Sequence, residues 1–271
     1  MPARVVSFNV NGLRSRLHQL EAVIALHSPD IIGLQETKVS DQEFPHEAIR
    51  KLGYEVCFHG QKGHYGVALL SKSPAITVTR GFPLDSEDSQ RRMIHGEYLV
   101  NGQTLHVING YFPQGESRIH PTKFPAKEKF YADLWSYLKL NFKTEDALIV
   151  MGDMNVAPQD IDVGIAPDNA KRWLKTGKCA FLPEEREWLE NLLNWGLHDS
   201  FRTQHQDDSR YSWFDYRSRG FEQDPKRGLR IDLILASPAL MQKLSDSGID
   251  TEARGFEKPS DHCPVWVDLS L

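Results

Sequence analysis

The sequence predicts one α/β domain over residues 1–271, a four-layered sandwich of two packed mixed β-sheets flanked by helices. Short apolar segments typical of strands alternate with helical patterns along the whole chain. Some of these strands are joined by hairpin turns and others by helices, which gives both antiparallel and parallel pairs. No Gly/Ser tract, low-complexity run or fixed-period repeat divides the chain. Together these observations favour one large domain over several small ones.

The strands are predicted from short runs of apolar and β-branched residues that end in turn-forming residues. Asn11-Gly12 closes the first run, and Asn101-Gly102 lies between two runs that we expect to form a hairpin. The expected strands lie in Val5–Val10, Ile31–Leu34, Tyr54–His59, Gly66–Ser71, Glu97–Phe112 (two strands), Ala147–Met151, Ile231–Ala236 and Val265–Leu269.

Helices are predicted where apolar residues recur at intervals of three and four. The first pattern begins at Leu13 and ends before Pro29, because the residue before a proline disfavours helical backbone. A later pattern begins at Pro183, which is a common first residue of a helix. The apolar stripes are Leu13, Leu17, Leu20 and Ile24; Phe130, Leu134 and Leu138; and Trp188, Leu189, Leu192 and Leu193.

Composition excludes several classes of protein. Lys plus Arg number 32 and Asp plus Glu 37, so the net charge is only −5, and 40% of residues are hydrophobic, which argues against disorder. The longest aliphatic run, Ala147–Met151, is far shorter than the roughly 20 residues of a membrane-spanning helix. The N-terminal segment has no apolar core of a signal peptide. The three cysteines are far apart and form no CxxC pair, which fits a reducing cytoplasm and disfavours a zinc site.

Polar side chains follow or interrupt most of the predicted strands. Taken singly, each is more simply explained as a turn or cap residue. Taken together, they are expected to converge, because ligand sites in α/β proteins form where strands end. The carboxylate inside the strand Ile231–Ala236 needs a buried partner, and a histidine beside another carboxylate can supply it. The residues of this set are Asn9, Asn11, Gln35, Glu36, Tyr111, Asp153, Asn155, Asp232, Asp261 and His262.

Such a cluster has the chemistry of a metal-assisted phosphoester hydrolase. Carboxylate and amide oxygens suit Mg²⁺ or Mn²⁺ better than zinc. An aspartate–histidine pair orients an imidazole that can hydrogen-bond a phosphate or move a proton. The sequence contains no GxSxG, HExxH or GxxxxGK[ST] motif and no GxGxxG opening a helix. The motifs of serine hydrolases, zinc proteases, P-loop nucleotide hydrolases and dinucleotide-binding enzymes are therefore absent.

The ordered motifs resemble those of the exonuclease/endonuclease/phosphatase superfamily, and most closely the bacterial exonuclease III family of abasic-site endonucleases. The resemblance covers essentially the whole chain, including Lys178–Arg186 and Tyr211–Arg217. Cys263 departs from the family pattern, in which alanine is usual, and because it is also small we expect no loss of activity. The motifs are Phe8–Gly12, Leu34–Lys38, Gly110–Pro113, Gly152–Asn155, Ile231-Asp232 and Ser260–His262.

The resemblance implies a role for each residue of the cluster. Glu36, with Asn9 and Asp261, would hold the principal Mg²⁺, for which Mn²⁺ can substitute. Asp153 and Asn155 would lie across the scissile phosphate, where some accounts place a second ion. The family descriptions disagree on metal number and on the general base. The implied metal residues are Asn9, Glu36, Asp153, Asn155, Asp261 and His262, and the implied catalytic residues are Tyr111, Asp153, Asn155, Asp232 and His262.

DNA contacts are expected despite the acidic total, because a few Lys and Arg near the site can bind the phosphate backbone. For any one of these charges, a solvated surface position is the competing explanation. A core position is the competing explanation for Trp213, whose polar neighbours favour a pocket for a baseless sugar. The implied DNA-binding residues are Asn11, Arg91, Arg92, Gln114, Lys171, Arg172, Trp213, Phe214 and Arg217.

The resemblance therefore implies a bacterial cytoplasmic enzyme of DNA base-excision repair. It would cut duplex DNA 5′ to abasic sites, remove 3′-blocking groups including phosphate, and degrade 3′ ends exonucleolytically. No membrane and no obligate protein partner are expected. One alternative is a 3′-end exonuclease and phosphatase without abasic incision. Two others are a phosphatase for lipids, inositol phosphates or RNA tails, and a non-catalytic DNA-binding module with the same fold.

Overall fold

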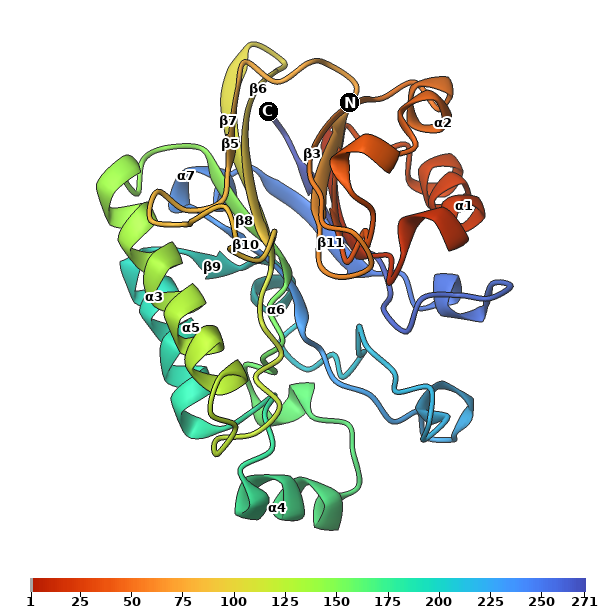
Figure 1. Ribbon diagram of the computed structural model, residues 1–271, viewed down its shortest axis with the longest axis vertical. Helices are drawn as coiled ribbons and strands as arrows, with labels where there is room; N and C mark the ends of the chain where they lie inside the picture. The colour runs from red at the N-terminus through yellow and green to blue at the C-terminus, as the bar shows by residue number, and fades with distance from the viewer. Residues whose placement is uncertain (1) are drawn as a thin grey trace.

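Two six-stranded β-sheets pack face to face, and helices cover their outer faces (Figure 1). The computed structural model describes residues 2–271. The predicted four-layered α/β sandwich is confirmed. Each sheet contains one parallel pair and is otherwise antiparallel, so both are mixed as expected.

The first sheet contains both ends of the chain. Its strand order is β11-β12-β1-β2-β4-β3, with β1 and β2 parallel. In chain order its strands are β1 (Ala3–Asn9), β2 (Ile31–Gln35), β3 (Glu55–His59), β4 (Val67–Ser71), β11 (Leu244–Ile249) and β12 (Val265–Leu269).

The second sheet is formed by the middle of the chain. Its strand order is β5-β6-β7-β8-β10-β9, with β7 and β8 parallel. Its strands are β5 (Thr77–Arg80), β6 (Met93–Val100), β7 (Gln103–Tyr111), β8 (Leu148–Asp153), β9 (His198–Asp199) and β10 (Asp232–Ala236).

Helices form the two outer layers. On the first sheet, Leu20 and Val23 of α1 pack against the apolar outer residues of β1 and β2. On the second sheet, α3 and α5 bury Leu134 and Leu189 against β7 and β8, while α4 projects at the bottom of Figure 1. The α-helices are α1 (Leu17–His27), α2 (His46–Lys51), α3 (Lys123–Asn141), α4 (Pro167–Thr176), α5 (Pro183–Trp195), α6 (Ser200–Gln204) and α7 (Pro238–Met241). Short 3₁₀ helices lie at Leu13–Ser15, Asp41–Glu43, Asp160–Asp162, Gly220–Glu222 and Glu252–Gly255.

Several element boundaries differ from the prediction. The helical pattern from Leu13 is broken, because a 3₁₀ turn over Leu13–Ser15 precedes α1. The first strand of the predicted hairpin begins at Met93 rather than Glu97. Strands β5 and β11 were not predicted, because they lie at sheet edges and carry largely polar or exposed side chains that break the apolar pattern.

The two sheets approach closely beneath the strand ends that carry the polar residues. A Cβ on Gly33 would lie 2.4 Å from Met151 Cε and 2.9 Å from Asn109 Cγ of the other sheet, so a larger residue would have to displace both side chains. Buried Gln35 and Asn109 then join the sheets through a 2.6 Å hydrogen bond. This close contact fixes the ends of β2 and β7 relative to one another.

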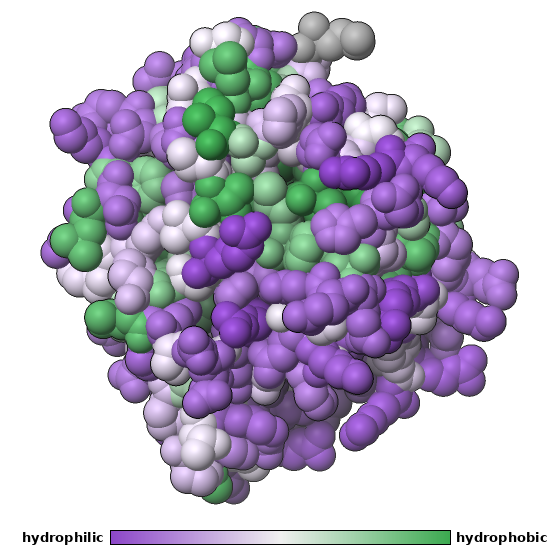
Figure 2. Space-filling view, turned by 45° about the horizontal axis from the view of Figure 1, so that its top comes forward, coloured by the Kyte–Doolittle hydropathy of each residue, from purple (hydrophilic) through white to green (hydrophobic). Residues whose placement is uncertain are grey.

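The outer surface is mixed in character. Figure 2 shows a face on which hydrophilic residues cover the lower half and hydrophobic residues gather in the upper middle. Within residues 2–271, no helix has the length and apolar character needed to span a membrane.

Candidate active site

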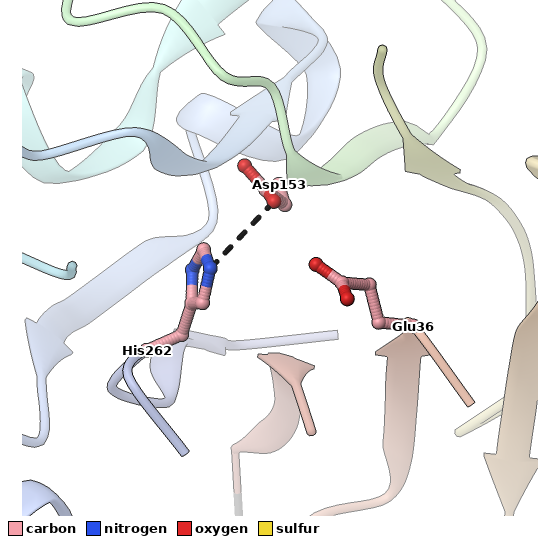
Figure 3. A group of neighbouring side chains, drawn as sticks. All are labelled: Glu36, Asp153 and His262. Atoms are coloured by element: carbon pink, nitrogen blue, oxygen red, sulfur yellow. Dashed lines mark ion pairs between the residues drawn. The ribbon is translucent and has the colours of Figure 1, made fainter. Parts of the chain in front are cut away.

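Three of the predicted residues meet where the ends of the two sheets face each other. Glu36 directly follows β2, Asp153 ends β8, and His262 precedes β12 (Figure 3). One ligand atom from each residue lies within 4.8 Å of the others. Glu36 and His262 therefore come from the first sheet and Asp153 from the second, so the site exists only because the sheets pack together.

Strand pairing carries the other site residues to the same place. In the parallel pairs, Asn9 lies beside Gln35, and Tyr111 lies beside Asp153. Asp232, at the start of β10, pairs with Asp153 across the antiparallel ladder. Asp232 is thus a strand residue, as the sequence indicated, and it is buried beside the carboxylate that ends β8.

Asn9 links the two carboxylates of the cluster. Its Nδ2 donates to Glu36 Oε1 at 3.1 Å and to Asp153 Oδ2 at 3.0 Å. Its Oδ1 accepts from the backbone N–H of Asn11 at 2.9 Å. In this arrangement Asn9 fixes the distance between the carboxylates across the sheet interface.

His262 is held by a buried hydrogen-bond chain. Its Nδ1 lies 2.9 Å from Asp232 Oδ2, and Ser212 Oγ donates to the same oxygen at 2.7 Å. The Ser212 hydroxyl also accepts from the backbone N–H groups of Ile231 and Asp232, both at 3.0 Å. The other ring nitrogen, Nε2, faces Asp153 Oδ2 at 3.8 Å. The chain therefore orients the imidazole toward the shared space of the site.

A tight turn after β8 presents Asn155 beside Asp153. Asn155 has a φ of +52°, a conformation that asparagine tolerates better than most residues. Its backbone N–H donates to Asp153 Oδ1 at 3.1 Å, and its Nδ2 donates to the Phe112 carbonyl at 2.9 Å. The turn depends on Gly152, because a Cβ there would lie 1.9 Å from the Gly110 carbonyl oxygen.

The two carboxylates have opposite pKa shifts. Burial alone would raise the pKa of Glu36, but the Lys38 ammonium at 2.9 Å, His262 and the Asn9 amide together hold this pKa below its usual value. Burial is the main cause that raises the pKa of Asp153, to about 7; the His262 charge and the Asn9 amide lower this pKa, and the charges of Asp232 and Glu36 raise it. Negative charge is therefore stabilised at the end of β2 and crowded at the end of β8.

Two other groups of the site are shifted as well. Burial would lower the pKa of His262, but the carboxylates of Asp232 and Asp153 raise it above its usual range. Burial and the Glu36 and Asp153 charges raise the pKa of Tyr111, so its hydroxyl stays a proton donor. Both residues can therefore donate hydrogen bonds to an anion placed between them.

The carboxylates fit a hard divalent cation. Two carboxylates brought to one place repel each other unless a positive charge lies between them. Of the six predicted metal residues, Glu36, Asp153 and His262 gather. The amide nitrogen of Asn9, not its oxygen, faces the carboxylates, and Asp261 accepts hydrogen bonds from Asn11 and Trp213. The structure thus brings together part of the predicted ligand set, with Glu36 and Asp153 at its centre.

A cavity of about 490 Å³ opens beside the cluster. Trp213, Leu229 and Ile231 give it an apolar wall, and Asn155 joins it to the site. Trp213 Nε1 donates to Asp261 Oδ2 at 3.1 Å, so the indole is oriented by a residue next to His262. The cavity is also lined by one acidic residue, Asp215, and by several basic and amide side chains: Gln114, Arg172, Lys178, Arg217, Gln223 and Arg227.

The predicted DNA-binding residues separate into three groups. Gln114, Arg172, Trp213 and Arg217 line the cavity. Asn11 lies at the site, where its side chain bonds Asp261 and Lys38, whereas Arg91 and Lys171 lie elsewhere on the surface. Phe214 and Arg92 are buried in the structure.

Phe214, which the resemblance implied as a DNA-binding residue of an aromatic pocket, is a core residue and does not line the cavity. Its side chain is 1% exposed and packs with the buried residues between the sheets. Because neighbouring residues of an extended segment point in opposite directions, Trp213 faces the cavity while Phe214 faces the core.

Arg92 is also buried, so it does not present its guanidinium to a DNA backbone. Its Cζ lies 4.2 Å from the ring centre of Tyr65 and 4.5 Å from that of Tyr111. It donates to Gln90 at 2.6 Å and to the Tyr111 carbonyl at 3.0 Å. Arg92 therefore orients Tyr111, and the charge pattern of Gln90-Arg91-Arg92 gave no sign that one arginine points inward.

Two residues of the site were not predicted. Ser212 bonds Asp232, and Lys38 pairs with Glu36. Both lie inside motifs that the sequence analysis quoted, but a serine and a lysine in a polar loop have no distinctive spacing. Only the strand pairing that brings residues 212–214 beside 261–263 reveals the role of Ser212.

Comparison with known proteins agrees with this geometry. The model of the endonuclease/exonuclease/phosphatase family matches residues 6–262. The chain is 56% identical to exodeoxyribonuclease III of Haemophilus influenzae, over 98% of this chain and 99% of that protein. It is similar to a 3′ phosphatase from Neisseria bound to product DNA hairpin (TM-score 0.89, 37% identity, 99% of this chain and 100% of that one). It is equally similar to an AP endonuclease from Archaeoglobus fulgidus (TM-score 0.89, 36% identity, the same coverage). The chain therefore belongs to the endonuclease/exonuclease/phosphatase family.

Proposed function

We propose that this protein is a Mg²⁺-dependent DNA repair nuclease that hydrolyses the phosphodiester 5′ to abasic sites in duplex DNA. It also removes 3′-blocking groups and shortens 3′ ends. The observation that carries the proposal is that Asn155, whose backbone N–H bonds Asp153 of the Glu36–Asp153–His262 cluster, also lines the cavity walled by Trp213. The exodeoxyribonuclease III of Haemophilus and the AP endonuclease of Archaeoglobus support the same activity.

The proposed division of labour follows from the surroundings of each residue. Glu36, with Asn9 and Asp261 nearby, would hold the principal Mg²⁺, or Mn²⁺ in its place, and Asp153 and Asn155 would lie across the phosphate, where a second ion would bind. The cation would supply charge neutralisation at the phosphate and favour ionisation of the attacking water. Asn155 would hold the phosphate, and Asp153 would orient or deprotonate the water. One or two ions are compatible with this donor set.

His262 and Tyr111 would stabilise the charge that develops on the phosphate. His262 is fixed by Asp232 and Ser212, so its Nε2 points to the site at no further cost in orientation. Tyr111 is held against Arg92 and would donate to a non-bridging or leaving oxygen. Both donors come from rigid strand ends, which keeps their positions fixed during the reaction.

Specificity for an abasic site would come from the cavity. An abasic nucleotide has no base to unstack, so rotating it out of the duplex is less costly than flipping a paired nucleotide. The apolar wall of Trp213, Leu229 and Ile231 suits a bare deoxyribose. The basic side chains that line the cavity, which include Arg172 and Arg217, would bind the flanking phosphates. Double-stranded DNA with abasic sites or blocked 3′ ends is thus the proposed partner, and the bacterial cytoplasm the proposed location.

The second candidate is a 3′-end exonuclease and phosphatase that does not incise abasic sites. It is favoured by the similarity to the 3′ phosphatase from Neisseria. The same catalytic cluster would serve both reactions, so the cavity beside Trp213 decides between them. If the cavity is too narrow to admit a nucleotide from within a strand, only a nucleotide at the 3′ end can reach the cluster.

The deciding experiment uses an end-labelled duplex with one tetrahydrofuran abasic analogue, incubated with Mg²⁺ or with EDTA. The main proposal expects one Mg²⁺-dependent cut 5′ to the analogue, together with slower shortening from the 3′ end. A ladder from the 3′ end without incision would establish the second candidate. Absence of any cleavage, with cleavage of lipid or RNA phosphates instead, would overturn both.

A further inference from the structure

A buried ion pair lies behind the site and has no place in the mechanism described above. Lys127 of α3 and Glu185 of α5 are both 0% exposed, and Lys127 Nζ pairs with Glu185 Oε1. Burying two charges is costly, and an apolar pair of similar volume is often at least as stabilising. Stability alone therefore does not account for these residues.

The pair connects three loop segments through backbone hydrogen bonds. Lys127 Nζ donates to the Asn155 carbonyl at 2.8 Å and to the Gln114 carbonyl at 3.4 Å. Glu185 Oε2 accepts from the backbone N–H groups of Ala180 and Leu182, both at 2.8 Å. Each charged side chain thus contacts both the opposite charge and backbone groups of a neighbouring loop.

The segments joined in this way are those that build one side of the site. Gln114, Asn155 and Ala180 all line the cavity beside the cluster. Asn155 also carries the turn that holds Asp153 Oδ1. One turn further along α3, Tyr131 donates to the Met154 carbonyl at 2.8 Å, so α3 holds two successive peptides of this turn.

Helix capping explains only half of the pair. Glu185 lies in the first turn of α5 and bonds the backbone N–H of Leu182, as residues at this position of a helix commonly do. A glutamine could cap equally well. Lys127 lies in the first half of α3 and caps nothing, and its two backbone contacts are both with residues of the cavity wall.

We propose that Lys127 and Glu185 are positioning residues for hydrolysis. They fix the Asn155 turn relative to the cavity wall, so that Asp153 and Asn155 meet the phosphodiester of a bound nucleotide in the productive orientation. The inference rests on the proposed nuclease function. Because misplacing a reacting group by about 1 Å can cost roughly 10²-fold in rate, a buried support of this kind acts on the chemical step.

The test is the double variant Lys127→Met, Glu185→Gln, which removes both charges together and keeps a capping oxygen. We expect the single-turnover cleavage rate of the abasic duplex to fall about 10- to 30-fold. The dissociation constant for the same duplex, measured in EDTA, should change less than about 3-fold, because the pair touches no DNA. The matched control is Lys129→Met, Asp133→Asn, an ion pair on the solvent side of the same helix, which should cleave like the wild type.

A wild-type cleavage rate in the folded double variant would overturn the inference, and so would a loss confined to DNA affinity. If the double variant does not fold, the double variant Lys127→Gln, Glu185→Gln decides, because it keeps a hydrogen-bonding group at both positions and leaves no buried charge unpaired. A 3- to 10-fold lower rate with unchanged affinity is then expected, and an unchanged rate would overturn the inference. Failure of the wild type to cut abasic DNA would instead count against the proposed function.

Discussion

The end of β2 in the first sheet and the end of β8 in the second are equivalent places with different surroundings. Each is the carboxyl end of a strand in the parallel pair of its sheet, and each carries a carboxylate of the cluster. Glu36 pairs with a lysine and its pKa is lowered. Asp153 is buried beside another aspartate and its pKa is raised.

This difference shows how one pair of strand ends can supply two chemical roles. A carboxylate whose charge is stabilised suits a permanent cation ligand. A carboxylate whose charge is crowded binds protons more readily and suits the group that orients or accepts a proton from water. The two sheets thus place a holding residue and a reacting residue within 4.8 Å of one another.

The largest effect is expected from Asp153→Asn. The amide keeps the shape but cannot take a proton, so cleavage of the abasic duplex should fall by about 10³- to 10⁴-fold. Affinity for the duplex should stay within about 5-fold. Single-turnover kinetics at saturating enzyme measure the first quantity and fluorescence anisotropy in EDTA the second. Cleavage within 10-fold of wild type would remove Asp153 from the reacting role.

Glu36→Gln should behave differently, because it weakens the metal site without removing the proposed base. At about 1 mM Mg²⁺ we expect a loss of roughly 10²-fold, partly restored at higher Mg²⁺ or with Mn²⁺. The same titration with Asp153→Asn should restore little. The comparison fails if both variants respond to metal concentration in the same way.

The sequence predicted the members of the cluster more accurately than their contacts. Glu36, Asp153, Asp232 and His262 could be found because each interrupts or ends an apolar strand, and strand ends converge. Which way a side chain points from a loop could not be predicted. Arg91 and Arg92 are chemically alike, yet one is partly exposed and the other is buried between two tyrosines.

The other features that the sequence did not predict depend on contacts between segments far apart in the chain. Lys127 and Glu185 are 58 residues apart, and each looks like an ordinary charge in a helical pattern. Their meeting depends on how α3 and α5 pack on the second sheet, which no local pattern specifies. The polar edge strands β5 and β11 were missed for a similar reason, since the neighbouring strand, rather than their own apolar pattern, defines them.

Substitutions of Arg92 and Arg91 should have smaller effects, and these effects should differ in kind. Arg92→Met removes the guanidinium stacked on Tyr111, so cleavage should fall about 5- to 10-fold at saturating DNA, with a lower melting temperature. Arg91→Met should instead weaken DNA binding, and reduce the salt dependence of binding by about one phosphate contact. Equal effects of both variants on the salt dependence would show that Arg92 reaches the DNA after all.

The smallest effect on activity is expected from a substitution of His95, which lies on the outer face of the second sheet and whose ring contacts His106 and Tyr137 rather than any residue of the cluster. Burial and the neighbouring His106 lower the pKa of His95 to about 4. In the unfolded chain, the pKa of His95 has its usual value near 6.5, so between pH 6.5 and 4 the unfolded state binds a proton that the folded state does not. The free energy of unfolding is therefore highest above pH 6.5 and decreases as the pH falls toward 4. At pH 4 the loss in the free energy of unfolding amounts to about 3 kcal/mol.

His95→Gln should flatten the dependence of unfolding free energy on pH between 6.5 and 4 by up to about 1.4 kcal/mol per pH unit. Urea unfolding at a series of pH values measures this slope, and His64→Gln, at an exposed position, is the control. Cleavage at pH 7.5 should be nearly unchanged. A slope that stays as steep as in the wild type would assign the acid sensitivity to other groups, such as His59, whose pKa burial also lowers to about 4.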